Sequence, residues 1–144
     1  MKLEIRPFIG EYDWGWVKQH IGVLRVEDTC GLMGIDSEKN ETVTACIMDN
    51  WLNRCVQLQF VCTNSMALRH GFIEACFDFV FNEQGMNSAY AMIAENNKAS
   101  LKVAKHMGFV EKTRLTDAYD DGIDFILFEM LRKDCKYLPV REVA

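Results

Sequence analysis

The chain has 144 residues, of which 49% are hydrophobic and 26% charged, and its mean hydropathy is -0.08. This predicts one folded domain and excludes disordered, collagen-like, coiled-coil and low-complexity chains. The formal net charge of -5 is spread over both halves, so we expect no nucleic-acid partner. No apolar run approaches the roughly 20 residues that span a bilayer, and no signal peptide opens the chain. We therefore expect a cytoplasmic protein without membrane contact.

The cysteines, at positions 30, 46, 55, 62, 76 and 135, show no C-x-x-C spacing. Their even number allows three disulfides, but the chain shows no export signal and four of the six lie inside apolar runs. We predict reduced thiols that are buried or half-buried. The three histidines have no neighbour at a metal-ligand spacing, so no metal site is predicted.

The first half of the chain predicts strands around one helix. Alternation of apolar and polar residues over 3–6 predicts a short strand that Pro7 ends. The spacing of Trp14, Val17 and Ile21 predicts a helix over 12–23. Three strands of an antiparallel meander follow, at 29–36, 42–49 and 55–62.

The second half alternates helices with strands. Apolar spacings of three and four predict a helix over 66–82, which Asn64 or Ser65 caps and Gly85 ends. The long helix lets the next strand, 89–94, lie parallel to 55–62. Asn97 and Gly108 bracket a second helix. Two strands follow, at 110–115 and 125–131, joined by an acidic turn at 117–124, and the apolar last strand is expected to be buried on both faces.

The element order is therefore β-α-β-β-β-α-β-α-β-β. It predicts an α/β (α+β) fold with a mixed sheet, an antiparallel N-terminal meander, a central parallel pair and helices on both faces. We expect a single domain over 1–144, with a core over about 1–131 and a loosely ended polar tail at 132–144.

The run from Asn97 to Phe109, NKASLKVAKHMGF, resembles the N-x-x-S … G-F segment of the GNAT superfamily of N-acetyltransferases, and most of all its ribosomal-protein alanine acetyltransferases. The element order agrees with that family over about 1–131. Short phage-encoded acetyltransferase-like proteins also look similar, particularly in the ending M-L-R-K-D-C at Met130–Cys135. The resemblance implies a GNAT fold and acetyl-coenzyme A as the cofactor.

In that family the cofactor lies in a V-shaped opening between two parallel strands, here 55–62 and 89–94. Unpaired backbone groups there can bind the amide-bearing pantetheine arm like an added strand. The pyrophosphate lies at the N-terminus of the following helix. The resemblance thus implies cofactor-binding residues at Phe60, Val61, Cys62, Ala67, Leu68, Arg69, His70, Gly71, Asn97, Ser100 and Lys105.

The phosphate-binding motif of the family, Q/R-x-x-G-x-G/A, is altered in this chain. Ala67 and Arg69 occupy its two glycine positions, and Gly71 comes two residues late. Glycines let a phosphate approach bare backbone. Arg69 either turns outward and pairs with a phosphate oxygen, or fills the site so that no cofactor binds.

The acid and the base of the reaction are also not the family's usual ones. Ala104 stands where many members carry a tyrosine that protonates the leaving thiolate, which leaves Ser100, Tyr90 or a water. Many members carry a glutamate base on the strand that here has Gln57 and Gln59. Gln59 can orient an amine or a water but cannot accept its proton. Other carboxylates that we considered are Glu95, Asp117, Asp120, Asp121 and Asp124.

Two functions follow as hypotheses. The first is an N-acetyltransferase that moves acetyl from acetyl-coenzyme A to a primary amine of a peptide, a protein or a small molecule. The second is a binding or structural protein, such as one encoded by a phage, that keeps the fold without catalysis. A coenzyme A sensor is a third alternative. A homodimer with the last strand at its seam is left open.

Overall fold

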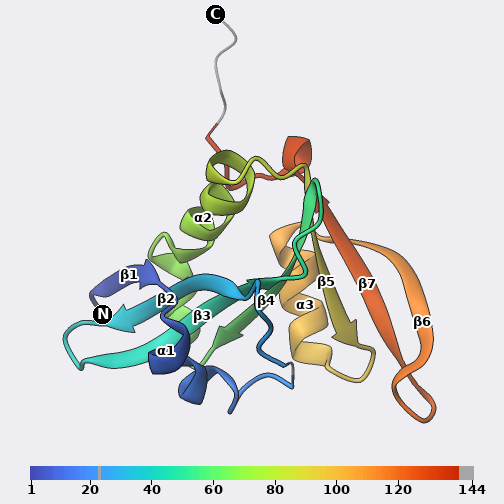
Figure 1. Ribbon diagram of the computed structural model, residues 1–144, viewed down its shortest axis with the longest axis horizontal. Coiled ribbons are helices and arrows are strands. Elements are labelled where there is room, and N and C mark those ends of the chain that lie inside the picture. The colour runs from blue at the N-terminus through green and yellow to red at the C-terminus, as the bar shows by residue number, and fades with distance from the viewer. Residues whose placement is uncertain (23, 140–144) are drawn as a thin grey trace, which may run out of the picture.

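A mixed sheet with the strand order β1-β2-β3-β4-β5-β7-β6 forms the centre of the protein, as the computed structural model shows (Figure 1). The structure describes residues 1–22 and 24–139. All neighbouring strands pair antiparallel except β4 and β5, which are parallel. The seven strands are β1 (Leu3–Pro7), β2 (Cys30–Asp36), β3 (Glu41–Asp49), β4 (Cys55–Cys62), β5 (Ser88–Ala94), β6 (Val110–Asp120) and β7 (Ile123–Leu131). The predicted order and mixed sheet are confirmed.

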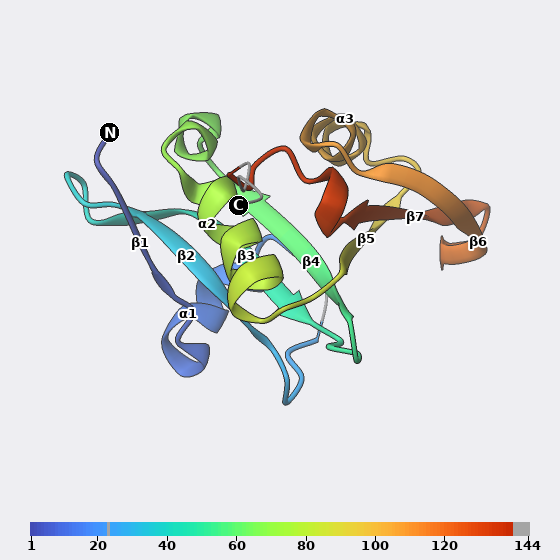
Figure 2. The same ribbon diagram turned by 90° about the horizontal axis from the view of Figure 1, so that it is seen from above.

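Helices cover both faces of the sheet, as predicted. Figure 2 shows α1 (Gly10–Val17) on one side, and α2 (Phe72–Phe77) and α3 (Lys98–Met107) on the other. Successive residues of a strand point to opposite faces, so each face has its own apolar cluster. The larger cluster lies under α2 and α3, and the smaller one gathers Val17 with residues of β2, β3 and β4. Among the described residues, no helix is long and apolar enough to cross a membrane.

Two predicted helices differ from those observed. The helix expected over 12–23 is α1, which ends at Val17; the chain then turns, and Val23 lies outside the described residues. The helix expected over 66–82 is divided into a 3-10 turn at Ser65–Arg69, α2, and a π-helical segment at Asp78–Glu83. Gly71 causes the first break because its backbone is left-handed, with φ +84°, and cannot continue a helix. Apolar spacing persists through these segments, so periodicity alone does not reveal the breaks.

The C-terminal hairpin is longer than predicted. β6 continues to Asp120, so most of the expected acidic turn belongs to strands, and Gly122, with φ +74°, lies in the actual turn. β7 is not buried on both faces, because α1 does not extend over this part of the sheet. Ile126, Phe128 and Met130 are buried, whereas the residues that alternate with them, Leu127 and Glu129, are half-buried. β7 also lies between β5 and β6, so the sheet edge is β6 and not the last strand.

The segment after β7 joins the core, although it was predicted to be a loose polar tail. Cys135 is buried in the larger cluster, and the Tyr137 ring stacks on Phe77 with centroids 5.5 Å apart. Leu138 also packs against this cluster, and residues 140–144 lie outside the described part. All six cysteines are free, as predicted, but Cys62 is exposed because it ends its strand.

Candidate functional site

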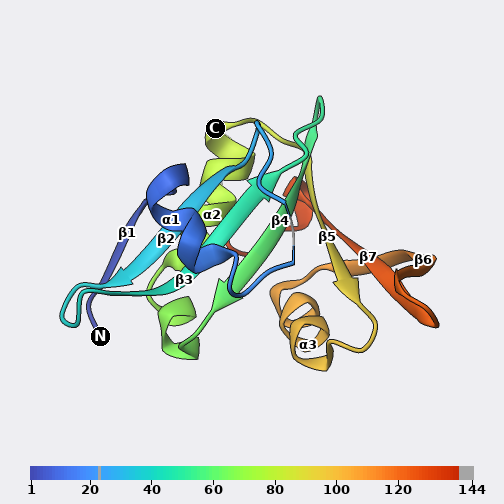
Figure 3. The same ribbon diagram turned by 60° about the horizontal axis from the view of Figure 1, so that its bottom comes forward.

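The two parallel strands separate partway along their length. They pair only from Cys55 with Ser88 to Gln57 with Tyr90, although β4 runs on to Cys62 and β5 to Ala94. Figure 3 shows the two strands diverging beyond this point. The predicted V-shaped arrangement of these strands is therefore present.

The backbone of β4 presents unpaired groups along this divergence. In an antiparallel pair, residues whose backbone groups bond to the neighbouring strand alternate with residues whose groups point away. The Thr63 N–H donates to the Val43 carbonyl at 2.9 Å, and β3 and β4 keep the same register along β4. Phe60 and Cys62 therefore turn their backbone groups toward β5, where they meet no strand partner.

The same argument applies to β5. The Arg132 N–H donates to the Asn87 carbonyl at 2.8 Å, in the register that β5 and β7 share. Met92 therefore turns its backbone N–H and carbonyl toward β4, beyond the last paired residue. Phe60 and Met92 thus offer donors and acceptors from opposite sides of the divergence. An extended ligand with amide groups can pair with both, as an added strand would.

The segment that follows β4 differs from the expected helix start. The Asn64 side chain accepts the Met66 N–H at 3.0 Å, so the predicted cap is present, but it caps a 3-10 turn. Ala67 is fully buried within this turn, and Leu68 packs against the larger cluster. The α-helix begins only after Gly71, whose missing Cβ would meet no atom within 4 Å. The open amides of a helix start therefore lie beside Gly71.

Arg69 and His70 both lie exposed in this segment. Neither side chain makes a hydrogen bond or ion pair with another described residue, although the His70 backbone N–H donates to the Ala67 carbonyl at 3.4 Å. Of the two outcomes considered for Arg69, its exposure agrees with the outward one, and its pairing with a phosphate stays a prediction. Among the other predicted cofactor residues, Phe60 packs on Phe77, with ring centroids 6.1 Å apart, and Val61 is buried beside α1.

The start of α3 is built as predicted. The Asn97 side chain accepts the Ser100 N–H at 3.2 Å, and Gly108 ends the helix with φ +106°. Ser100 is half-buried on the α2 and α3 side of the sheet, and Lys105 is exposed in the last turn. The structure therefore does not bring Ser100 to the same face as Tyr90 and Gln59.

A row of polar side chains crosses the opposite face at the point where the strands separate. Asp49, Gln57, Tyr90 and Glu129 are successive pairing partners across β3, β4, β5 and β7. Their neighbours along each strand belong to the larger cluster, so the row itself faces the α1 side. Gln59 lies on the same face, two residues further along β4.

Asp49 is the functional candidate that the sequence did not reveal. Its residue is only 3% exposed, and its Oδ1 has no hydrogen-bond partner. Gln59 Oε1 is the other buried side-chain atom without a partner among the described residues. Burial, with a smaller contribution from Asp28, raises the pKa of Asp49 to about 6. In the sequence, Asp49 is marked only as a single acidic residue at the end of an apolar strand. Many turns without a functional role have the same pattern.

The residues around Asp49 are held in place but supply no cation. The two carboxylate oxygens of Asp28 accept the N–H groups of Asn50 and Trp51 at 3.3 and 3.0 Å. The Asn50 side-chain amide donates to Gln57 Oε1 at 2.7 Å, so Gln57 is engaged whereas Gln59 is not. Burial, and then the nearby Cys55, Asp49 and Asp28, raise the pKa of Tyr90, which keeps its hydroxyl protonated at neutral pH.

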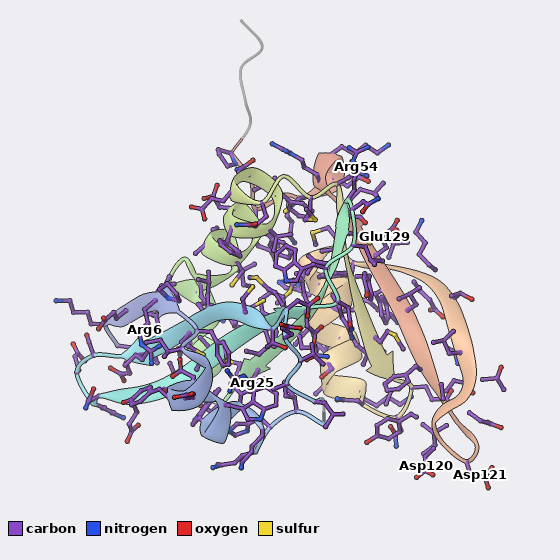
Figure 4. The ribbon with its side chains drawn as sticks, in the orientation of Figure 1. Arg6, Arg25, Arg54, Asp120, Asp121 and Glu129 are labelled. Carbon is purple, nitrogen blue, oxygen red and sulfur yellow. The ribbon has the colours of Figure 1, made fainter. Side chains whose placement is uncertain are left out.

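The other carboxylates considered from the sequence are engaged or distant. The Glu95 carboxylate accepts hydrogen bonds from the Arg114 guanidinium at 3.0 Å and from the Asp124 N–H at 2.9 Å. It therefore connects β6 and β7 to the end of β5. Figure 4 shows Asp120 and Asp121 at the far tip of the hairpin, away from the polar row. These groups therefore have structural or solvated positions.

Comparisons with known proteins agree with this geometry. Residues 39–124 match the acetyltransferase (GNAT) domain family. No curated protein matches the chain. Among solved structures, mutant forms of the spermidine/spermine N-acetyltransferase SpeG from Vibrio cholerae superpose with a TM-score of 0.74 at 13% identity, covering 92% of this chain and 96% of that one.

Two further structures are similar. The Vibrio cholerae spermidine N-acetyltransferase in complex with CoA and spermine has a TM-score of 0.72 at 12% identity, over 92% of this chain and 96% of that one. A ribosomal-protein-S5-alanine acetyltransferase from Vibrio fischeri has a TM-score of 0.64 at 16% identity, over 75% of this chain and 64% of that one. At these identities, the likenesses support the fold.

Proposed function

Because the chain belongs to the GNAT acetyltransferase family, we propose that it transfers an acetyl group from acetyl-coenzyme A to a primary amine. The observation that carries this proposal is the separation of β4 and β5 after the Gln57 and Tyr90 pair. It leaves the backbone groups of Phe60 and Met92 free to bind the pantetheine arm. The acetyl end then lies where the strands meet.

The pyrophosphate end of the cofactor belongs at the open end of the divergence, beside Gly71. Amides at the start of α2 and the exposed guanidinium of Arg69 supply donors there. In this arrangement Arg69 substitutes by charge for the bare backbone that the missing glycines would give. Asn97, which caps α3, and Ser100 and Lys105 within this helix are the proposed contacts along the arm and at the adenosine phosphate. Ala67 acts through packing, since it is fully buried.

The reacting groups belong at the closed end. Backbone N–H groups of β4 polarise the thioester carbonyl, and the Tyr90 hydroxyl protonates the leaving thiolate. Gln59 orients the attacking nitrogen. Orientation of the two reactants supplies much of the rate, because it removes the entropic cost of their encounter.

The proposed acceptor is a small-molecule amine rather than a peptide. The similar structures include acetyltransferases of small amines, spermidine and spermine, and one of a ribosomal protein. The superposition with the spermidine/spermine N-acetyltransferase covers 92% of this chain, against 75% for the ribosomal-protein enzyme. The acidic surroundings of the polar row, with Asp28 and Asp49, suit a cationic acceptor.

The non-catalytic alternative rests on a specific observation, the replacement of both motif glycines by Ala67 and Arg69. A thermal-shift titration with acetyl-coenzyme A tests the cofactor binding that a transferase or a coenzyme A sensor requires and that a purely structural protein does not. Ligand at a hundredfold excess over its dissociation constant stabilises the folded state by about 2.7 kcal/mol. A clear shift is expected, and an absent shift at millimolar concentration rejects the transferase.

Charge reversal tests the phosphate contact. Arg69→Glu is expected to abolish the shift with acetyl-coenzyme A, because it places a carboxylate beside the pyrophosphate. Arg54→Glu is the matched control, since Arg54 is also exposed but precedes β4, at the opposite end of the strand (Figure 4). Unchanged affinity in the Arg69 variant would exclude that contact. Release of free thiol with added amines then measures transfer.

A further inference from the structure

Two unpartnered oxygens belong to residues of neighbouring strands on the α1 face of the sheet. Asp49 Oδ1 and Gln59 Oε1 are the two buried side-chain atoms of the described residues that lack a hydrogen-bond partner. Asp49 pairs with Gln57, so Gln59 is its diagonal neighbour on the adjacent strand, within reach of a long side chain. Both atoms are acceptors. Buried acceptors without donors are rare in folded proteins, so each of these oxygens is expected to accept from a water or a ligand.

Within the described residues, the surroundings of Asp49 include a second carboxylate and no positive charge. Asp28 approaches from the loop before β2, Cys30 from β2 and Tyr90 from β5, and none of these carries positive charge. No lysine, arginine or histidine of the described part forms an ion pair with Asp49 or Asp28. The backbone N–H groups of Asn50 and Trp51 are directed to Asp28, so they do not serve Asp49. The donor that satisfies Asp49 and Gln59 is thus expected to be a cation.

The position of these oxygens relates them to the reacting atoms. Asp49 pairs with Gln57, and Gln57 with Tyr90, at the point where β4 and β5 separate. This inference rests on the proposed function, which puts the acetyl end at that point. We propose that Asp49 and Gln59 bind the protonated amine of the acceptor, and that the Asp49 carboxylate removes its proton before attack. The acceptor class is a primary alkylamine that is cationic at neutral pH.

The chemistry balances as follows. The ammonium gives one proton to the Asp49 carboxylate, and the freed nitrogen lone pair forms a bond to the thioester carbonyl carbon. The C–S bond breaks, its electron pair stays on sulfur, and Tyr90 gives that sulfur a proton. The second nitrogen proton returns through water to Tyr90, and Asp49 releases its proton to solvent. The products are the N-acetylamine, free coenzyme A and one proton. Because Asp49 has a pKa of about 6, it is mostly ionised at pH 7 yet still basic.

The first test measures the amine site without acetyl transfer. The carboxyl carbon of Asp49 is titrated by NMR in the full chain, alone, with 1,4-diaminobutane, and with the uncharged 1,4-butanediol. A bound ammonium favours the ionised carboxyl, so the diamine is expected to lower the Asp49 pKa by about one unit or more. The diol is expected to leave it unchanged. An Asp49 pKa that the diamine does not move overturns the inference.

The second test separates proton removal from structure. In Asp49→Asn, kcat/KM for 1,4-diaminobutane is expected to fall by about 10²- to 10⁴-fold, which is the rate factor that a general base usually contributes. Trifluoroethylamine is already neutral at pH 7, so its acetylation is expected to change by no more than about threefold. The control is Asp36→Asn, because Asp36 is buried to a similar extent, 4% against 3%, at the other end of the sheet. It is expected to leave both amines unaffected.

The outcomes distinguish the inference from the proposed function. Equal losses with both amines, or no loss, would overturn the role of Asp49 even if the protein transfers acetyl groups. If the diamine lowers the Asp49 pKa but acetyl-coenzyme A gives no thermal shift, the transferase and the base role both fail, and the amine site stands. If neither ligand has an effect, both proposals are refuted.

Discussion

Removing the charge of Asp49 is expected to stabilise the ligand-free protein. In the folded state this carboxylate is 3% exposed, and one of its oxygens has no partner. Its pKa is raised from 3.8 to about 6. A raised acid pKa means that the folded state binds the proton more tightly than the unfolded state, so ionisation of Asp49 opposes folding. Asp49→Asn keeps the shape and removes that cost.

The magnitude follows from the shift in pKa. A shift of roughly two units corresponds to about 3 kcal/mol, and the buried amide of asparagine has a cost of its own. We therefore expect a gain of about 1–3 kcal/mol at pH 8. The gain should shrink as pH falls from about 6 toward 4, because the wild-type carboxyl becomes protonated in the folded state and regains that stability.

Urea unfolding at several pH values between 4 and 8 measures this gain. The slope m should stay constant, so that the midpoint alone reports stability. Asp36→Asn is again the control, because Asp36 Oδ1 accepts the Glu38 N–H at 3.1 Å and the change removes no unpaired acceptor. A loss of stability in Asp49→Asn at pH 8, or a gain that does not depend on pH, would refute the reasoning.

Three further substitutions and one control test the fold by urea unfolding. Arg6→Met is expected to cost about 3 kcal/mol at pH 7, because it strands the buried Asp13 carboxylate. Burial by itself would raise the pKa of Asp13, but the hydrogen bonds from Arg6 and from the Ile9 N–H lower it below its usual value. The cost of removing Arg6 should therefore diminish as the pH falls below about 4 and Asp13 becomes protonated. Phe77→Ala, which unstacks the C-terminal segment, should cost about 3–5 kcal/mol. Gly31→Ala should cost more than about 2 kcal/mol, since its Cβ would meet the Cys46 carbonyl oxygen. Leu24→Ala is the control, since Leu24 is 83% exposed, and it should change stability by less than about 0.5 kcal/mol.

The sequence predicted the features that depend on local chemistry. Asn97 and Gly108 marked the ends of α3 because capping and left-handed backbone each favour specific residue types. The alternation in β4 gave its bounds without error. The element order placed β4 and β5 in parallel, because a helix connects them.

The features that depend on tertiary context were not predictable in this way. Gly71 breaks a helix whose apolar spacing continues unchanged on both sides. The length of β6 depends on its pairing with β7, since every residue of β6 is exposed and no burial pattern marks it. Asp49 stands out only when its missing partner is seen, and sequence cannot show which buried oxygens lack donors.

The most direct test of the account concerns the amide protons of Phe60 and Met92. Both should exchange rapidly with solvent in the ligand-free protein, because β4 and β5 no longer bond to each other there, and both should become protected when acetyl-coenzyme A is added. The Val61 amide is the internal reference, since it bonds to β3 in either state. Protection of Phe60 and Met92 before any cofactor is present, or no change at saturating cofactor, would contradict the account.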